Sequence, residues 1–491
     1  MSFDTICNLY DASSIVDCYE GDATNPIPEI KDENGEWNTV GHPDRLLHIT
    51  RKELAVFAQL FDGGDNWKGA RLPVLHVKEI VDFLRCISNQ ERRLGDYQNE
   101  ISVTQMWDET NAQKNNLILR SVHFPGDTYD LIYSGPHIFV GNPLFKTSRR
   151  ECRLNSDYDN IDLTNIGSHY YQRVNYTPQT DLNSYVLQIP DAGWGAKCND
   201  TYRVLFRRML NLGGERTLIG AIVPPHTGHV STMISVTFMD KRKMLLFAGL
   251  SMSLPYDAFV KVLGKGDMYL DTIIRLPFFK HYDFSIILRA LMLNCLTDAY
   301  KDLWEDSWDD SYNLDSWAKE DERLPKRDFT SLEKVWNQNI IPRNDYARRQ
   351  LLVELDVLSA QRMGLSLEQL KVVYRILFPI MRQYENETWY DRNGRISFTT
   401  NRSLTGVGFS RSEWENKNAV VPNSRGDSEW DGIMKNAPAG YVFTRTIMDD
   451  TMPGGPVERT IEYVAPFDRC DREQDYEIAW KFFEEKYSKQ E

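Results

Sequence analysis

The chain has 491 residues, of which 41% are hydrophobic, 12% aromatic and 26% charged. This composition is ordinary for a globular protein and excludes a disordered chain, while the length suggests about three structural units. The formal net charge is −14, and a uniformly acidic surface of that charge would repel nucleic acid.

The positive charge is concentrated in the middle of the chain. Residues 141–295 contain 18 basic and 13 acidic side chains, whereas the rest of the chain carries a net charge of −19. A basic centre between acidic flanks is compatible with a polyanion site on an otherwise acidic protein.

Targeting and redox features predict a cytoplasmic protein. No apolar run approaches the ~18 residues that cross a bilayer, and the N-terminus lacks a basic segment followed by an apolar one, so neither a membrane span nor a signal peptide is expected. The cysteines never form a CxxC pair, which favours reduced thiols over a disulfide framework or a zinc ribbon. They are Cys7, Cys18, Cys86, Cys152, Cys198, Cys295 and Cys470.

Helices and strands alternate irregularly in the first half of the chain. Helical apolar spacing predicts helices over residues 49–61 and 74–87, the first with a capping box between Thr50 and Glu53. Alternating or apolar runs ended by Gly and Pro predict strands over residues 117–124 and 130–141.

The centre of the chain reads as an irregular mixture of helix and strand. Residues 200–210 fit either a helix or a strand-to-helix junction, and the apolar run 216–225 predicts a buried strand closed by two prolines. Two further strands are expected over residues 234–240 and 243–253.

The second half begins with the strongest helical pattern, residues 284–304, which is apolar around most of its circumference. Residues 345–378 predict two helices that Gly364 separates, the second with a capping box of Ser366 and Gln369. A hairpin around Gly454 and Gly455 and a short helix over residues 476–487 complete the predicted elements.

These elements predict a mixed α/β fold in which an irregular mixed-sheet domain is flanked by long spacer helices. We expect four parts. They are a mainly helical connector (1–135), an α/β domain (136–295), a helical spacer with an acidic, Trp-rich stretch (296–380) and a Gly/Asn-rich region that contains strands (381–491).

Catalytic motifs are missing from the sequence. It has no P-loop, no GxGxxG after a strand, no HExxH, no GxSxG and no kinase motif set. The Asn-Pro-Pro-Tyr/Phe loop of amino-methyltransferases is also missing, because Asn142 and Pro143 are followed by Leu144 and Phe145. We therefore predict no catalytic site and no cofactor in this chain.

Two polar clusters could be either ligand-binding sites or ordinary polar loops. His226 and His229 are three residues apart but have no carboxylate or cysteine nearby in sequence, so a loop is favoured over a metal site. The acidic residues between Asp468 and Asp475 alternate with arginines, which favours a solvated charged turn over a cation site. Cys470 lies among them without an assignable histidine partner, so neither a metal site nor a nucleophile is predicted.

Clusters of basic side chains in the central region are candidates for DNA contact. Arginine and lysine bind phosphates, while arginine and asparagine also read base edges. The alternative is ordinary surface charge, which composition alone favours. The candidates are Lys146, Arg149, Arg150, Arg173, Asn175, Arg207, Arg208, Lys241, Arg242 and Lys243.

The segments that carry these residues resemble a known family. IYSGPHIFVGNPLFKTSRREC, QRVNYTP, TYRVLFRRMLNLGGERTLIGAIVPP and DDTMPGGPVERTIEYVAPFD are similar to the region downstream of the catalytic domain in large type IIG-like DNA adenine methylases. Those enzymes belong to restriction–modification and phage-defence systems. The likeness covers roughly residues 45 to 480, and GERTLIGAIVPP and PGGPVERTI are its more specific segments.

The resemblance implies a target-recognition, or specificity, component without the methyltransferase core. Residues 136–295 would recognise double-stranded DNA, and the flanking helices would dock on a methyltransferase subunit, with or without a nuclease. S-adenosylmethionine is then expected on that partner and not on this chain.

Several alternatives remain open at this point. The chain could be a separate subunit, a fragment of a split gene, or a stand-alone DNA-binding or anti-restriction protein. Two functions of other classes are a protein-interaction scaffold that does not contact DNA and a divergent DNA methyltransferase or nuclease.

Overall fold

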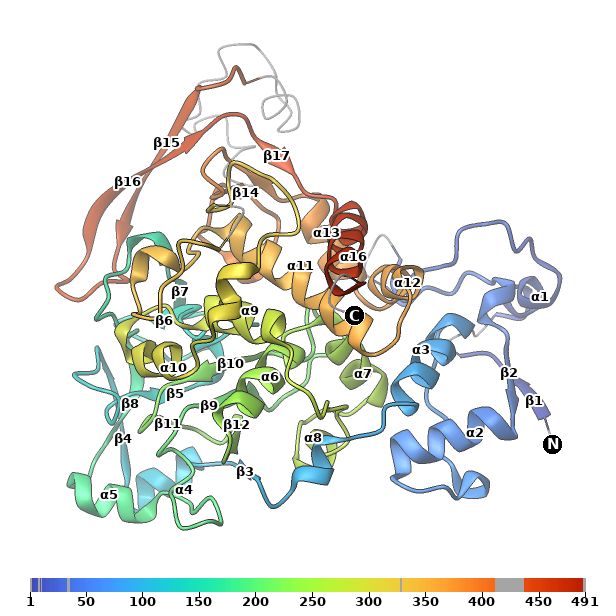
Figure 1. Cartoon of the computed structure of the whole chain (residues 1–491), viewed down its shortest axis with the longest axis horizontal. Helices are drawn as coiled ribbons and strands as arrows, with labels where there is room; N and C mark the ends of the chain where they lie inside the picture. Colours follow the sequence, from blue (N-terminus) through green and yellow to red (C-terminus); the bar gives the residue numbers. More distant parts are fainter. Residues whose placement is uncertain are drawn as a thin grey trace.

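The computed structural model describes residues 2–7, 9, 11–32, 36–326, 329–410 and 437–488. Helices and strands are mixed throughout (Figure 1), which confirms the predicted α/β class. The strands are β1 Ser2–Thr5, β2 Leu47–Thr50, β3 Ile101–Thr104, β4 Ile118–His123, β5 Ile132–Tyr133, β6 Lys146–Ser148, β7 Tyr158–Asn160, β8 Val174–Pro178, β9 Arg203–Arg207, β10 Gly220–Val223, β11 Gly228–His229, β12 Met233–Phe238, β13 Trp389–Tyr390, β14 Ile396–Phe398, β15 Val442–Asp449, β16 Val457–Val464 and β17 Asp468–Arg469.

The α-helices are distributed along the whole chain, with short 3-10 turns and one π turn (Ala58–Asp62) between them. They are α1 Ala12–Glu20, α2 Arg51–Phe57, α3 Lys78–Ser88, α4 Glu109–Lys114, α5 Leu182–Gln188, α6 Lys241–Ser251, α7 Leu254–Leu263, α8 Leu270–Ile273, α9 Phe284–Asn294, α10 Lys301–Asp306, α11 Asp345–Arg362, α12 Leu367–Leu377, α13 Pro379–Asn386 and α16 Arg472–Ser488.

A four-stranded antiparallel sheet lies at the centre, in the order β10-β9-β12-β3. All six residues of β12 and all four of β10 are buried, as expected for strands covered on both faces. The predicted strands at 216–225 and 234–240 are therefore confirmed. Residues 200–210, which the pattern left open, contribute the inner strand β9.

Helices cover this sheet in succession: α6 packs on its strands, α9 packs on α6, α11 on α9 and α16 on α11 (Figure 1). Their apolar side chains belong to one continuous core that extends from Leu47 to Phe483. This core includes residues of all four expected parts of the chain.

The prediction of a strand over residues 243–253 is wrong, because these residues form helix α6. Asp240 caps the helix by accepting hydrogen bonds from the backbone N–H groups of Arg242 and Lys243. Eight residues of α6 are buried between the sheet and α9, and a helix that is buried all round shows no amphipathic spacing.

The single helix predicted over residues 284–304 is interrupted. Helix α9 ends at Asn294, whose side chain accepts a hydrogen bond from the backbone N–H of Ile222 and donates one to the carbonyl of Ala290. Helix α10 begins only at Lys301. A side-chain contact with the neighbouring strand thus ends a helix that the apolar pattern would continue.

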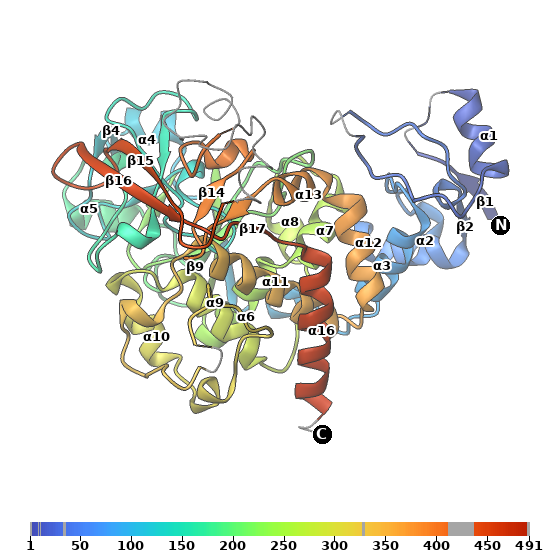
Figure 2. The same ribbon diagram turned by 90° about the horizontal axis from the view of Figure 1, so that it is seen from above.

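The N-terminal elements form a lobe beside the rest of the molecule, with α3 packed on α12 (Figures 1 and 2). The Thr50–Glu53 capping box predicted for the first helix is present at the start of α2. The second predicted box, formed by Ser366 and Gln369, is present at the start of α12. Both confirmations rest on short local motifs.

Several two-stranded pairs lie beside the central sheet: β4 with β8, β6 with β7, and β5 with β11. The predicted hairpin around Gly454 and Gly455 is confirmed as β15 and β16, and its eight-residue register is unbroken. Asp450, just beyond β15, forms ion pairs with Arg150 and Arg173, so the hairpin tip is held against the segment that follows β6.

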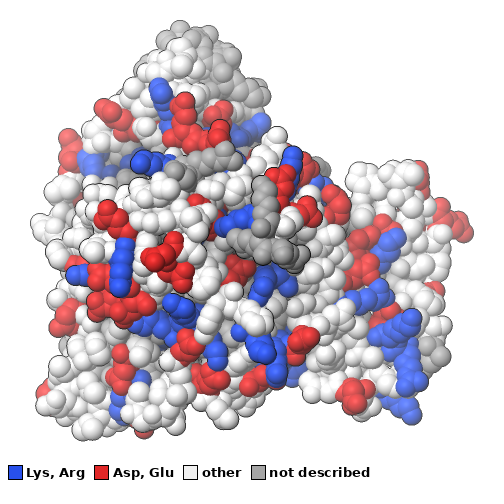
Figure 3. Space-filling view, viewed as in Figure 1, with Lys and Arg blue, Asp and Glu red and all other residues white. Residues whose placement is uncertain are grey.

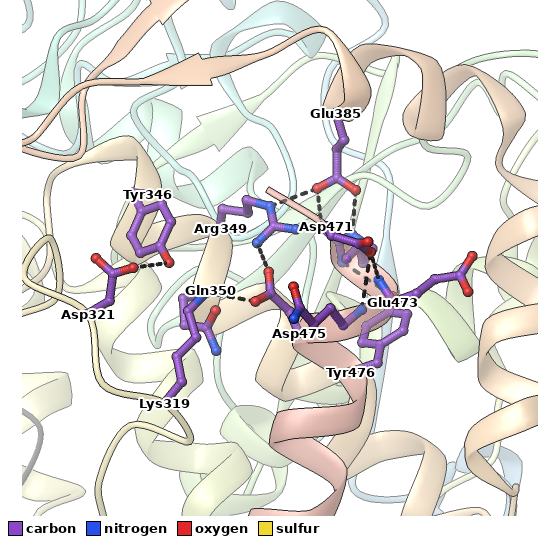
Figure 4. A network of polar contacts seen from close by, with 12 residues as sticks. Lys319, Asp321, Tyr346, Arg349, Gln350, Glu385, Asp471, Glu473, Asp475 and Tyr476 are labelled. Atoms are coloured by element: carbon purple, nitrogen blue, oxygen red, sulfur yellow. Dashed lines mark hydrogen bonds and ion pairs between the residues drawn. The ribbon is translucent and has the colours of Figure 1, made fainter. Parts of the chain in front are cut away.

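A buried ion network fastens the C-terminal helix (Figure 4). Arg349 of α11 and Arg472 of α16 both donate to Glu385 of α13, and each binds a second carboxylate, Asp475 and Asp356 respectively. The prediction of a solvated turn over residues 468–475 is therefore wrong for Arg472 and Asp475, which are buried. Helix α16 also begins four residues before the predicted helix.

Burial alone would raise the pKa of Glu385, but Arg472 and Arg349 outweigh it and lower the pKa to about 2. The carboxylate therefore stays ionised at neutral pH, and its two arginine partners stabilise it.

Among the described residues, no single helix has the length and apolar composition to cross a membrane. One pair of helices, α6 and α7, has this length and composition only when the two are taken together, and a 74° bend separates them.

We expect Arg472→Leu to lower the free energy of unfolding by about 3–5 kcal/mol, since it leaves buried carboxylates of Glu385 and Asp356 without their shared partner. Urea unfolding measures the loss. Arg92→Leu is the control, because Arg92 is exposed and its pair with Asp96 is at the surface, where about 0–1 kcal/mol is expected. Equal losses in the two variants would contradict the role of the network.

Candidate nucleic-acid interface

A cavity of about 590 Å³ lies where β4, β6, β7, β8 and the end of β9 meet. Three of the ten predicted DNA-contact residues line it: Lys146 on β6, Asn175 on β8 and Arg207 on β9. Leu154 and Met209 also line it, and each is 67% exposed. Segments that are distant in sequence thus place basic, amide and apolar groups around one hollow.

The cavity carries an excess of positive charge. Arg120 and Arg153 line it together with Lys146 and Arg207, and Glu109 is the only carboxylate among its described lining residues. Glu109 accepts a hydrogen bond from the hydroxyl of Tyr176. Within the part of the chain that the structure describes, none of the four cations forms an ion pair, and with Glu109 as the one carboxylate the lining keeps a net positive charge.

Aromatic rings hold two of these cations in place of carboxylates. The rings of Phe139 and Phe145 stack with centroids 4.8 Å apart. Lys146 Nζ lies 5.1 Å from the centroid of Phe145, and the Arg207 guanidinium lies 5.8 Å from that of Phe139. A cation–π contact attracts a cation without neutralising it, so the charge stays available to an anion.

Burial lowers the pKa values of both Lys146 and Arg207. It lowers the pKa of Lys146 to about 8, with a further lowering from nearby Arg207, and it lowers the pKa of Arg207 to about 10. Arg207 donates from Nη2 to the carbonyl of Ile138 over 2.6 Å, but its buried Nε has no partner among the described residues. An anion in the cavity would offset the cost of burying these charges.

Neutral polar groups form one wall of the cavity. The Asn175 amide donates from Nδ2 to the hydroxyl of Tyr158 over 2.5 Å, and this hydroxyl lies 3.1 Å from Ser134 Oγ. Asn175 is only 5% exposed, and its Oδ1 lacks a hydrogen-bond partner within the described residues. The wall of the cavity therefore contains an unpartnered acceptor as well as cations.

The other seven predicted residues each have a carboxylate close by. Arg149 pairs with Asp159, and Arg150 and Arg173 share Asp450. Arg208 lies 3.7 Å from Asp267. Lys241, Arg242 and Lys243 lie on the first turn of α6, close to Asp306, Asp309 and Glu100 respectively. The structure does not bring these seven residues into the cavity, and their contact with DNA stays a prediction.

Two other hollows are better balanced in charge. In a cavity of about 230 Å³, Arg395 and Arg459 both bind Asp162 at 2.6 and 2.7 Å. In a groove of about 720 Å³ between residues 26–32 and α13, Arg382 pairs with Glu29. Basic and acidic side chains are likewise interspersed on the face of the molecule that Figure 3 shows. The 590 Å³ cavity is therefore the better anion site.

Arg120 is a cavity residue that sequence reasoning missed. It lies on β4, more than twenty residues before the basic clusters, and its Nη2 donates to the carbonyl of Cys152 over 2.7 Å. A charged residue within the otherwise apolar run 117–120 was the available signal. Arg120 could be assigned to the cavity only from the pairing of β4 with β8, which places Arg120 opposite Tyr176, the neighbour of Asn175 on β8.

The histidines His226 and His229 and the thiol of Cys470 belong to the two polar clusters noted in the sequence. The ring of His226 stacks on Tyr129, and His229 is buried, with burial lowering its pKa to about 3. Burial raises the pKa of the Cys470 thiol. No group of three histidine, cysteine or acidic residues with metal-binding geometry occurs within the described ranges.

Comparison with known proteins gives no family assignment. No family model matches the sequence, and no curated protein matches it. The resemblance to type IIG-like methylases therefore stays an expectation, and the function has to be argued from the cavity.

The charge in the cavity can be tested directly. We expect Lys146 to titrate near pH 8, and Arg207→Gln to raise the pKa of Lys146, because it removes a neighbouring positive charge. NMR of ¹³C-dimethylated lysines measures both values, with Lys146→Arg to assign the signal. A Lys146 signal that titrates at the ordinary pKa of a lysine side chain, about 10.4, would contradict the desolvated site.

Proposed function

We propose that the chain is the DNA sequence-recognition component of a type IIG-like restriction–modification or phage-defence system of adenine methylation. In this proposal it holds duplex DNA in register for a methyltransferase subunit. That partner binds S-adenosylmethionine and extrudes the target adenine, which a methylase must do to reach a base inside a duplex.

One observation carries the proposal: four cations, none of which has an ion pair within the described residues, meet at one cavity of a protein whose net charge is −14. Elsewhere in the central region, the predicted cations lie close to carboxylates. A phosphate backbone supplies the missing negative charge, and release of its counterions drives binding. Asn175 and the aromatic side chains add groups that can contact bases.

The segments that resemble the methylase family support the same location. GNPLFKTSRREC contributes Lys146 and Cys152 to the cavity, QRVNYTP contributes Asn175, and TYRVLFRRM contributes Arg207. DDTMPGGPVERTI forms the hairpin tip, which is held beside them through Asp450. Segments up to 300 residues apart therefore meet around one site.

We expect the purified chain to bind duplex DNA with an affinity that falls as salt rises. In the double variant Lys146→Met and Arg153→Met, binding is weaker because fewer DNA phosphates are neutralised. The slope of log affinity against log salt is then shallower by about 0.9 for each phosphate that the variant leaves without a cation. Fluorescence anisotropy of a labelled duplex over a salt titration measures both quantities.

The matched control is Lys280→Met with Lys301→Met, two exposed lysines outside the cavity. It changes the net charge equally and should leave the salt slope as in the parent chain. If the parent chain does not bind duplex DNA even at low salt, the proposal fails, and the protein-interaction scaffold becomes the better account.

The chain alone should bind DNA without methylating it. We expect no tritium transfer from labelled S-adenosylmethionine to DNA by the purified chain, and transfer once a methyltransferase subunit from the same system is added. Transfer by the chain alone would instead establish a divergent methyltransferase.

A further inference from the structure

A phosphate accounts for the cations of the cavity but not for its unpartnered acceptor. Asn175 Oδ1 is buried, faces no donor within the described residues and belongs to a side chain that lines the cavity. A buried acceptor without a donor costs about 1–3 kcal/mol. An anion cannot relieve this cost, because it offers no N–H group.

The hydrogen-bond network indicates which amide atom is free. The backbone N–H of Ser134 donates to His137 Nδ1, so the proton of this imidazole is on Nε2, which lies 3.1 Å from Ser148 Oγ. Ser134 Oγ can then donate to His137 Nδ1, and Tyr158 can donate to Ser134 Oγ. Tyr158 is left to accept from Asn175 Nδ2, and Oδ1 stays without a donor in the wall of the cavity.

The cavity also has the size and the apolar surface for more than a phosphate. Its volume of about 590 Å³ is within the usual range for small-molecule sites, ~300–1,000 Å³. Phe139, Phe145, Tyr158 and Tyr176 line it, and aromatic side chains bind unstacked bases. A ligand that joins an anion to a flat group with an N–H donor would satisfy every feature.

We propose that the cavity binds a single unstacked nucleotide, whose base donates an N–H to Asn175 Oδ1 and whose phosphate lies against Lys146 and Arg207. The proposal rests on the proposed function for the source of the nucleotide, a DNA strand. A free mononucleotide has the same chemistry, and the experiment below distinguishes the two sources.

The first measurement compares two mononucleotides by isothermal titration calorimetry. Deoxyadenosine monophosphate has an amino group that can donate, whereas the purine deoxyriboside monophosphate lacks it and has no other N–H on the base. We expect the former to bind about tenfold more tightly to the parent chain. Asn175→Ala should abolish this preference, and equal binding of the two by the parent chain would overturn the proposal.

A second variant keeps the test decisive if Asn175→Ala does not fold. Lys146→Met should weaken binding of deoxyadenosine monophosphate about tenfold and leave that of deoxyadenosine, which lacks the phosphate, unchanged. Lys301→Met, an exposed charge-matched control, should change neither. An equal loss of nucleotide and nucleoside binding in Lys146→Met would overturn the placement of the phosphate.

The source is decided with duplexes that carry one bulged nucleotide. A bulged adenine should bind more tightly than a bulged purine or a fully paired duplex, and this preference should disappear in Asn175→Ala. Preference among mononucleotides without any effect of the bulge would overturn a strand as the source and assign the cavity to a free nucleotide. Duplex binding without any base preference would leave the proposed function intact and refute only the nucleotide site.

Discussion

The fold depends on buried arginines that share carboxylates. Arg349 and Arg472 both pair with Glu385, and these ion pairs connect α11, α13 and α16 to one another. Strand β13 follows α13, β17 precedes α16, and the two strands pair with each other. The ion network therefore fixes the base from which the β15–β16 hairpin extends (Figure 1), and the tip of this hairpin contacts the segments that form the cavity. Charge pairing in the core thus positions the site at a distance.

The cations of the cavity are held differently. In the core, each buried arginine of the network meets at least one carboxylate, and the pKa of Glu385 is lowered accordingly. In the cavity, Lys146 and Arg207 meet aromatic rings and each other, and burial lowers their pKa values. Perturbed cations that line a cavity are common at functional sites, and an anion bound there would offset the cost of burying them.

Local signals in the sequence predicted local structure well. The capping boxes at Thr50 and Ser366 and the glycine pair at Gly454 specify backbone geometry within a few residues, and all three are present. The prediction for residues 243–253 was wrong because burial on all sides hides the helical period of α6. The prediction of one helix over residues 284–304 was wrong because Asn294 forms a hydrogen bond with a strand residue that lies 72 positions earlier in the chain. Three of the predicted contact residues meet in the cavity, but Arg120 and the pairing of Asp450 follow only from tertiary contacts.

The pairing of Asp450 has a consequence for synthesis of the chain. Asp450 lies 300 residues after Arg150 and 277 after Arg173, the two cations that share its carboxylate. Domains begin to fold while the chain is still being made, from the N-terminus onward. A nascent chain that has already formed β6 and β8 therefore carries both arginines without their shared carboxylate until the ribosome delivers the hairpin. During this interval the surface around these two strands is more positive than in the finished protein.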